Sequence, residues 1–150
     1  MRSFAKFTLI VVTVTLLILC IILNGCAQGS RKAGSQQKVT RYGDVLGIKP
    51  EKIEEYKRLH ADVWPDVLKM IKECNIHNYS IYLGELEKGK YYLFSYFEYT
   101  GDDFKADMAK MAADPTTQRW WELCKPCQSP IPTRKEGEWW ANMEEVFHFE

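Results

Sequence analysis

Hydrophobic residues between positions 51 and 74 recur at alternating intervals of three and four, which is the period of an α-helix. The members of this stripe are Ile53, Tyr56, His60, Val63, Val67, Met70 and Cys74. Pro65 predicts a kink or a break into two helices, with Trp64 at the bend, although the stripe keeps its phase across it. Tyr56 and His60 therefore turn a phenol and an imidazole inward, either into the core or into a site within it.

Around this helical region the pattern predicts further strands and helices. Two segments rich in aromatic and β-branched residues, 77–83 and 91–99, suit a hairpin with a loop over 84–90. Asp102 and Asp103 suit the capping of a following helix. The remaining expected elements are a strand over 38–48, helices over 102–113 and 116–123, an irregular excursion over 124–137 and a last strand over 146–149.

The resulting order, β-α-β-β-α-β, is the ferredoxin-like pattern of an α+β fold, in which helices cover one face of an antiparallel sheet. The other face would carry much of the aromatic content of the chain. An exposed apolar face of this kind favours dimerisation. Two such sheets closing face to face would form a dimeric α+β barrel with an interior site.

The N-terminal segment has the pattern of an export signal rather than of a domain. Arg2 and Lys6 provide a positive start, and residues 7–23 are almost wholly apolar and uncharged. Cys26 follows directly, in the position of the lipidated cysteine of a bacterial lipobox. An uncleaved membrane anchor is the alternative, because about 20 apolar residues span a bilayer. Both interpretations tether the chain to a membrane, outside the cytoplasm.

Composition adds domain boundaries and excludes one class of partner. Residues 1–26 form the export segment, residues 27–37 are small and polar like a flexible tether, and residues 38–150 have the length of one domain. The chain holds 20 basic and 20 acidic residues, and removal of the export segment leaves 18 against 20. This balance gives no electrostatic reason to expect nucleic acid.

Two groups of residues are candidates for chemistry with organic ligands. His60 could shuttle protons near neutral pH, although a satisfied core histidine is the ordinary alternative. Tyr56, one turn earlier on the same buried face, favours a shared role for the two side chains. The tryptophan pairs 120–121 and 139–140 suit either core packing or a platform for a sugar ring, and both interpretations stay open.

Three cysteines belong to the domain, and two of them, Cys124 and Cys127, form a CxxC motif. Redox motifs of this spacing open a helix after a strand, whereas this one enters a proline-rich loop. A zinc site needs two more ligands, and Cys74 and His77 are the spare candidates. A disulfide or inert thiols are the favoured alternatives, and no metal is expected.

Several blocks of the chain resemble the L-rhamnose mutarotase family. They occur in the order found in the family and span nearly all of residues 39–150. The blocks are Tyr56–His60, Val63–Asp66, His77–Leu83, Gln118–Trp121 and Glu144–His148. The resemblance implies a homodimeric α+β barrel. By the same resemblance His60 is the proton donor, and the sugar-contacting residues are Tyr56, Tyr79, Trp120 and Trp121. The familiar members serve cytoplasmic rhamnose breakdown, so the export segment is a departure.

The expected activity is isomerisation of L-rhamnose between its α and β anomers through ring opening. His60 would give a proton to the ring oxygen, and water could serve as the partner base. Tyr56 and Tyr79 would hold hydroxyls, while Trp120 and Trp121 would form the apolar wall. No cofactor is implied, because the reaction has no redox step. The alternatives are a non-catalytic sugar-binding lipoprotein on the same fold and a haem-binding or monooxygenase-type barrel with His60 as ligand.

Overall fold

The computed structural model describes residues 38–149. The predicted export segment, Cys26 and the tether lie outside these residues. Within the described part of the chain, no helix is long and apolar enough to cross a membrane.

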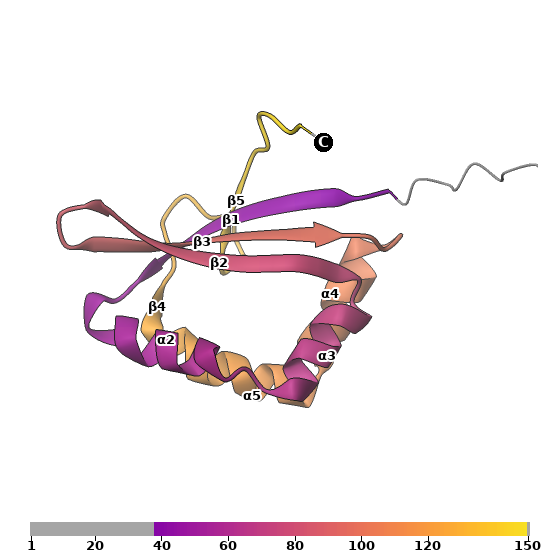
Figure 1. The fold of residues 1–150 in the computed structure, drawn as a ribbon, viewed down its shortest axis with the longest axis horizontal. Helices are drawn as coiled ribbons and strands as arrows, with labels where there is room; N and C mark the ends of the chain where they lie inside the picture. Colours follow the sequence, from indigo (N-terminus) through magenta and orange to yellow (C-terminus); the bar gives the residue numbers. More distant parts are fainter. Residues whose placement is uncertain (1–37, 150) are drawn as a thin grey trace, which may run out of the picture. The chain divides into compact units, whose positions relative to one another are not determined.

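Five strands form one antiparallel sheet (Figure 1). The strands are β1 (Thr40–Ile48), β2 (Ile76–Glu87), β3 (Lys90–Tyr99), β4 (Gln128–Ser129) and β5 (Ala141–Met143). Their order is β2-β3-β1-β4, and β5 pairs with β1 on the same edge as β4. This order confirms the predicted ferredoxin-like α+β fold.

The four α-helices of residues 38–149 lie on one face of this sheet (Figure 1). They are α2 (Ile53–Ala61), α3 (Pro65–Glu73), α4 (Phe104–Ala113) and α5 (Pro115–Cys124), with 3₁₀ turns η1 (Pro50–Lys52) and η2 (Lys125–Cys127). Helix α5 packs against α3 and α4, and α3 also packs against β2. The inner face of the sheet and the helices therefore enclose the core.

The predicted break at Pro65 is present, and it separates α2 from α3. Trp64 has φ −59° and ψ 134°, the extended backbone that a residue before proline prefers. The apolar stripe stays inward on both halves, since Tyr56, Val67 and Cys74 are all buried. One sequence pattern thus encodes two helices that share a face.

Aspartates begin the two later helices. The side chain of Asp103 accepts a hydrogen bond from the Ala106 amide at 3.0 Å, which confirms the predicted cap of α4. The side chain of Asp114 accepts one from the Thr117 amide at 2.7 Å and caps α5. Pro115 starts α5 and has no amide hydrogen, so one of the donors that the first turn of a helix leaves unpaired is absent there.

The hairpin is tighter than the sequence predicted. The loop was expected over 84–90, but β2 continues to Glu87 and the turn comprises Lys88 and Gly89. Gly89 has a φ of +76°, a backbone conformation that favours glycine. The charged residues at the end of β2 can continue the strand because both faces of the strand are exposed to solvent there.

The prediction of a last strand over Val146–Phe149 is wrong. The strand lies earlier, at β5, which occupies the edge of β1 opposite Gly43 to Val45. Val146, Phe147 and Phe149 follow outside the sheet with 89%, 80% and 83% of their surface exposed. The apolar run suggested a buried strand, but pairing with β1 stops at Met143, opposite Gly43, and the run beyond it stays exposed.

The core has two apolar clusters with a polar level between them. The first cluster contains Leu46, Ile48, Tyr56, Val67, Leu93, Trp120, Cys124 and Cys127, and the second contains Cys74, Ile76, Phe97 and Met111. On β1, Asp44 lies between Leu46 of the first cluster and Tyr42, which packs on the second. Its cross-strand partner on β3 is the buried Ser95.

The opposite face of the sheet carries the aromatic residues that the sequence assigned to it. Alternation along β3 turns Tyr92, Phe94 and Tyr96 to this face, and Tyr82 of β2 pairs with Phe94 there. Tyr82 keeps 63% of its surface exposed. Dimerisation through this face stays a prediction.

Candidate active site

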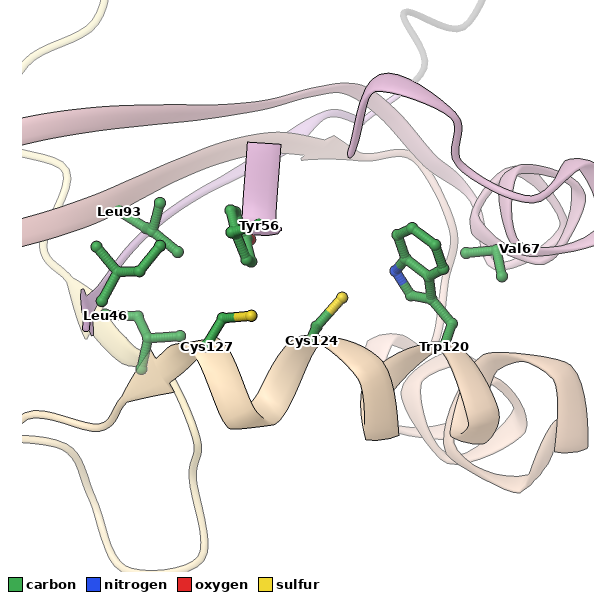
Figure 2. Packing of buried hydrophobic residues seen from close by; sticks show 8 residues of the cluster. Leu46, Tyr56, Val67, Leu93, Trp120, Cys124 and Cys127 are labelled. Atoms are coloured by element: carbon green, nitrogen blue, oxygen red, sulfur yellow. The ribbon is translucent and has the colours of Figure 1, made fainter. Parts of the chain in front are cut away.

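Three aromatic side chains from α2 and α5 form a stacked group inside the fold. The rings of Tyr56 and His60 are 4.1 Å apart between centroids and inclined by 29°. Trp120 meets the His60 ring edge-on at 5.5 Å, and Trp64 meets Trp120 in the same manner at 5.5 Å. Figure 2 shows Tyr56 and Trp120 reaching into the interior. His60 is therefore held between two aromatic neighbours.

The hydrogen bonding of His60 fixes which ring nitrogen can act. Its Nδ1 lies 3.0 Å from the Tyr56 carbonyl oxygen. Because a carbonyl only accepts, Nδ1 carries the hydrogen, and Nε2 is the nitrogen left for a ligand. Burial lowers the pKa of His60 below its ordinary 6.5, against the opposing effect of this hydrogen bond. At neutral pH His60 is thus an uncharged imidazole with a lone pair on Nε2.

Tyr56 is held as a protonated phenol. It is 5% exposed, and burial, with smaller effects from Tyr79 and Cys124, raises its pKa far above the ordinary value. The Gln128 side chain is its hydrogen-bond partner and opposes the shift. Gln128 is itself buried and accepts a 2.7 Å hydrogen bond from Trp139 Nε1. The sequence analysis did not single out Gln128, because a lone glutamine in an irregular segment carries no pattern.

Tyr79 reaches the inner face of the sheet through a β-bulge. His77 pairs with Glu98 and Ser80 with Tyr96, so two residues of β2 stand opposite one residue of β3. Asn78 takes a φ of +47° there, which asparagine tolerates better than most residues. Tyr79 is consequently turned to the inner face, where its ring meets Phe97 at 5.6 Å.

Tyr79 combines a raised pKa with an exposed side chain. Burial, with a smaller contribution from the charge of Asp44, raises its pKa to about 12. The residue still keeps 42% of its surface exposed. His60 and Asp44 resemble Tyr79 in this respect. Burial shifts the pKa of each, and each side chain remains partly accessible. These three side chains therefore keep surface that a ligand could reach.

Trp121 is the predicted site residue that the structure sets apart. It is only partly buried and packs against both apolar clusters. The ammonium of Lys125 lies 5.9 Å from its ring and 5.4 Å from the ring of Trp139. Consecutive helical residues point about 100° apart, so Trp120 alone of this pair faces His60.

The CxxC motif forms part of the core. Cys74, Cys124 and Cys127 are free and buried. Burial, followed by the effect of Cys127, raises the pKa of Cys124 to about 12, so its thiol stays protonated and weakly nucleophilic. Figure 2 shows both cysteines of the motif among the apolar side chains. Within residues 38–149, no group of three or more potential His, Cys, Asp or Glu ligands comes together.

Asp44 is a polar residue of the inner face that the sequence analysis missed. Ser95 Oγ donates to its carboxylate at 3.4 Å and Asn142 Nδ2 donates at 3.2 Å. Burial raises the pKa of Asp44, which these two hydrogen bonds oppose. The sequence does contain a sign of this position, because Asp44 alternates with Tyr42, Leu46 and Ile48 and therefore shares their face of the strand.

Two open hollows lie away from this group. One, of about 330 Å³, is lined by the ends of β1 and β3 and by residues 129–132. The other, of about 290 Å³, lies between β1 and the C-terminal residues 143–148. Neither is lined by His60, Tyr56, Tyr79 or Trp120. The candidate site is thus defined by the converging side chains.

Comparison with known proteins gives a consistent result. The family model for L-rhamnose mutarotase matches residues 41–149. The L-rhamnose mutarotase of Oceanobacillus iheyensis is 31% identical, over 73% of this chain and 98% of that protein. The L-rhamnose mutarotase of Bacillus subtilis is 36% identical, over 57% of this chain and 77% of that protein.

A solved structure shares the fold. The crystal structure of an L-rhamnose mutarotase from Formosa agariphila superposes with a TM-score of 0.56 at 22% identity, covering 74% of this chain and 99% of that one. The match of the family model over most of the chain shows the family. This chain belongs to the L-rhamnose mutarotase family and is an isomerase of the mutarotase type.

Proposed function

We propose that this enzyme interconverts the α and β anomers of L-rhamnopyranose, with His60 as the group that moves the proton of the anomeric oxygen. The observation that carries the proposal is the geometry of His60, whose Nδ1 is tied to the Tyr56 carbonyl while Nε2 is left for the sugar. The aromatic rings of Tyr56 and Trp120 on either side fix the plane of the imidazole. The names of the related proteins support L-rhamnose as the sugar.

The uncharged state of His60 determines the order of proton transfers. In ring opening, Nε2 takes the proton of the anomeric hydroxyl, the C1–O1 bond becomes a carbonyl, and the C1–O5 bond breaks. Water gives a proton to O5. After rotation about C1–C2, O5 loses that proton to water and attacks the other carbonyl face. The imidazolium then returns its proton to O1, so His60 acts as donor in the closing half.

The neighbouring side chains would hold the sugar during this cycle. Tyr56 and Tyr79 keep their protons at neutral pH, so each can donate a hydrogen bond to a hydroxyl or to the ring oxygen. Trp120 offers an indole face to the apolar side of the pyranose. Trp121 would contact the sugar only at the margin, because its ring lies beside Lys125.

The pH dependence of anomer exchange tests this assignment. The required form of His60 is the neutral one and its pKa is lowered, so exchange should be constant above about pH 6.5 and fall in acid. The tyrosines should cause no loss below about pH 10, since their pKa values are raised. NMR saturation transfer between the anomer signals of L-rhamnose measures the rate. A rate that rises in acid, or no exchange above the uncatalysed rate, would contradict the proposal.

We also propose that the enzyme works as a homodimer tethered to a membrane, outside the cytoplasm. The uncharged run over residues 7–23 and Cys26 support the tether, and the bare aromatic face of the sheet supports the dimer. Expression of the full chain in a bacterial host should give a membrane-bound protein, and the Cys26→Ser variant should lose its lipid. An unmodified chain recovered entirely in the soluble fraction of the cytoplasm would contradict the tether. Metabolic labelling with a palmitate analogue reads the lipid directly.

A further inference from the structure

Asp44 occupies a position that apolar packing alone would not give to an aspartate. It lies on the inner face of β1, between Leu46, which is fully buried, and Tyr42, which stacks on Phe97 at 5.0 Å. Asp44 is partly accessible, even though Tyr42 and Leu46, the next residues on the same face of β1, face the core. The two apolar clusters of the core end on either side of it. A partly accessible carboxylate therefore lies on the inner face of the sheet, beside Asn142 of the exposed edge strand β5.

The carboxylate is only partly satisfied by the protein. Ser95 and Asn142 each donate one hydrogen bond, at 3.4 Å and 3.2 Å, and both are neutral groups. Within residues 38–149, Asp44 forms none of the ion pairs with lysine or arginine. An ionised carboxylate can accept about four hydrogen bonds, so acceptor positions are left over. Burying such a charge without a cation costs stability, which a structural role does not explain.

Asp44 is also close to a proposed sugar contact. Tyr79 packs edge-on against Phe97, and Phe97 is two residues from Ser95, the cross-strand partner of Asp44. The charge of Asp44 contributes to the raised pKa of Tyr79, which indicates that the two groups share one environment. Tyr79 donates through its hydroxyl, whereas Asp44 only accepts. The pair thus offers complementary hydrogen bonding to neighbouring hydroxyl groups.

We propose that Asp44 binds the sugar, accepting hydrogen bonds from ring hydroxyls on the sheet side of the site, opposite His60 on α2. This inference rests on the proposed function, because it takes L-rhamnose as the ligand. Asp44 contacts the sugar equally in the ground state and during ring opening, so it contributes affinity and hydroxyl specificity. The proton transfers at O1 and O5 belong to other groups.

The Asp44→Asn variant of the full chain, purified in mild detergent, tests the proposal. The probe is methyl α-L-rhamnopyranoside, which keeps the ring hydroxyls but is blocked at the anomeric oxygen. Binding is followed by tryptophan fluorescence. Loss of charge-assisted hydrogen bonds should weaken binding by about 10- to 100-fold. For L-rhamnose itself, KM should rise by a similar factor while kcat stays within about threefold.

A stability measurement separates this role from a structural one. Because asparagine removes a buried charge and keeps the shape, the Tm of the variant should equal or exceed that of the parent chain. The matched control is Asp66→Asn on the exposed start of α3, which should leave affinity unchanged and lower the Tm only slightly, because it removes a negative charge from the first turn of a helix. Unchanged affinity in Asp44→Asn, a lowered Tm together with weaker binding, or a loss in kcat alone would each overturn the role of Asp44. A parent chain that exchanges no anomers and binds no sugar would overturn the proposed function as well.

Discussion

Replacing His60 by alanine is expected to slow anomer exchange of L-rhamnose by about 10²- to 10⁴-fold, the usual contribution of one positioned acid or base. The loss should fall on kcat, because alanine removes the proton shuttle while Tyr56, Tyr79 and Trp120 still surround the sugar. The pH dependence in acid should disappear in the same variant. Saturation transfer over a range of sugar concentrations separates kcat from KM.

The control for this experiment is His77→Ala. His77 is an exposed histidine on β2 that pairs with Glu98, so it lies on the face of the sheet opposite to the core residues Phe97 and Tyr99. Its replacement changes the same residue type outside the inner face. It should leave exchange within about twofold of the parent rate. A His60→Ala variant that folds and retains full exchange would show that the proton moves through another group.

Replacing Trp120 by alanine is expected to destabilise the fold by about 3–5 kcal/mol, the usual cost of removing a large buried aromatic side chain. Trp120 is 5% exposed and belongs to the first apolar cluster. It also packs against both His60 and Trp64, so the cavity would open between α2, α3 and α5. Since domains of this size are stable by about 5–15 kcal/mol, this loss is a large share of the total. Urea unfolding measures it.

Two variants make this measurement specific. Trp120→Phe keeps an aromatic ring and should lose less stability than Trp120→Ala. Leu123→Ala removes a large apolar side chain from the same helix at a position that is 42% exposed, and should change the unfolding free energy by less than about 1 kcal/mol. Equal losses for Trp120→Ala and Leu123→Ala would show that Trp120 is not a packing centre.

The local signals in the sequence were sufficient for the helices and for the first three strands, whereas β4 lies in a segment that was predicted to be irregular. The spacing from Ile53 to Cys74 and the position of Pro65 predicted two helices with one inward face, because both effects act within a few residues. The last strand was misplaced because hydrophobicity alone favoured Val146–Phe149. The strand forms at Ala141–Met143 instead, because these residues pair with β1, which is far away in the sequence. A local sequence pattern does not contain information about contacts between distant segments.

In the candidate site, too, local patterns revealed some residues, whereas others depend on features that a local pattern does not contain. Tyr56 and His60 were found from helical periodicity, and Trp120 faces them across the interior. Tyr79 followed only from the family resemblance, since strict alternation cannot reveal that a bulge at Asn78 changes the face of the next residue. On β1 the register with β3 is unbroken, but Gly43 and Gly47 have no side chain and leave few apolar positions from which an alternation could be recognised. Trp121, like Tyr79, entered the predicted site through the family resemblance. Its ring lies beside Lys125 on another side of the helix from Trp120, and its contact with the sugar stays a prediction.

The proline that divides the helices also sets the electrostatics at His60. Because α2 ends at Ala61, His60 lies in its last turn, where the aligned peptide dipoles leave a partial negative charge. An uninterrupted helix would have placed the same imidazole far from either pole. The positive charge that His60 acquires when it takes the sugar proton is favoured at such an end by about 0.3–1 kcal/mol. Pro65 would thus assist the proton transfer without any contact with the sugar, by ending the helix where a cation is formed.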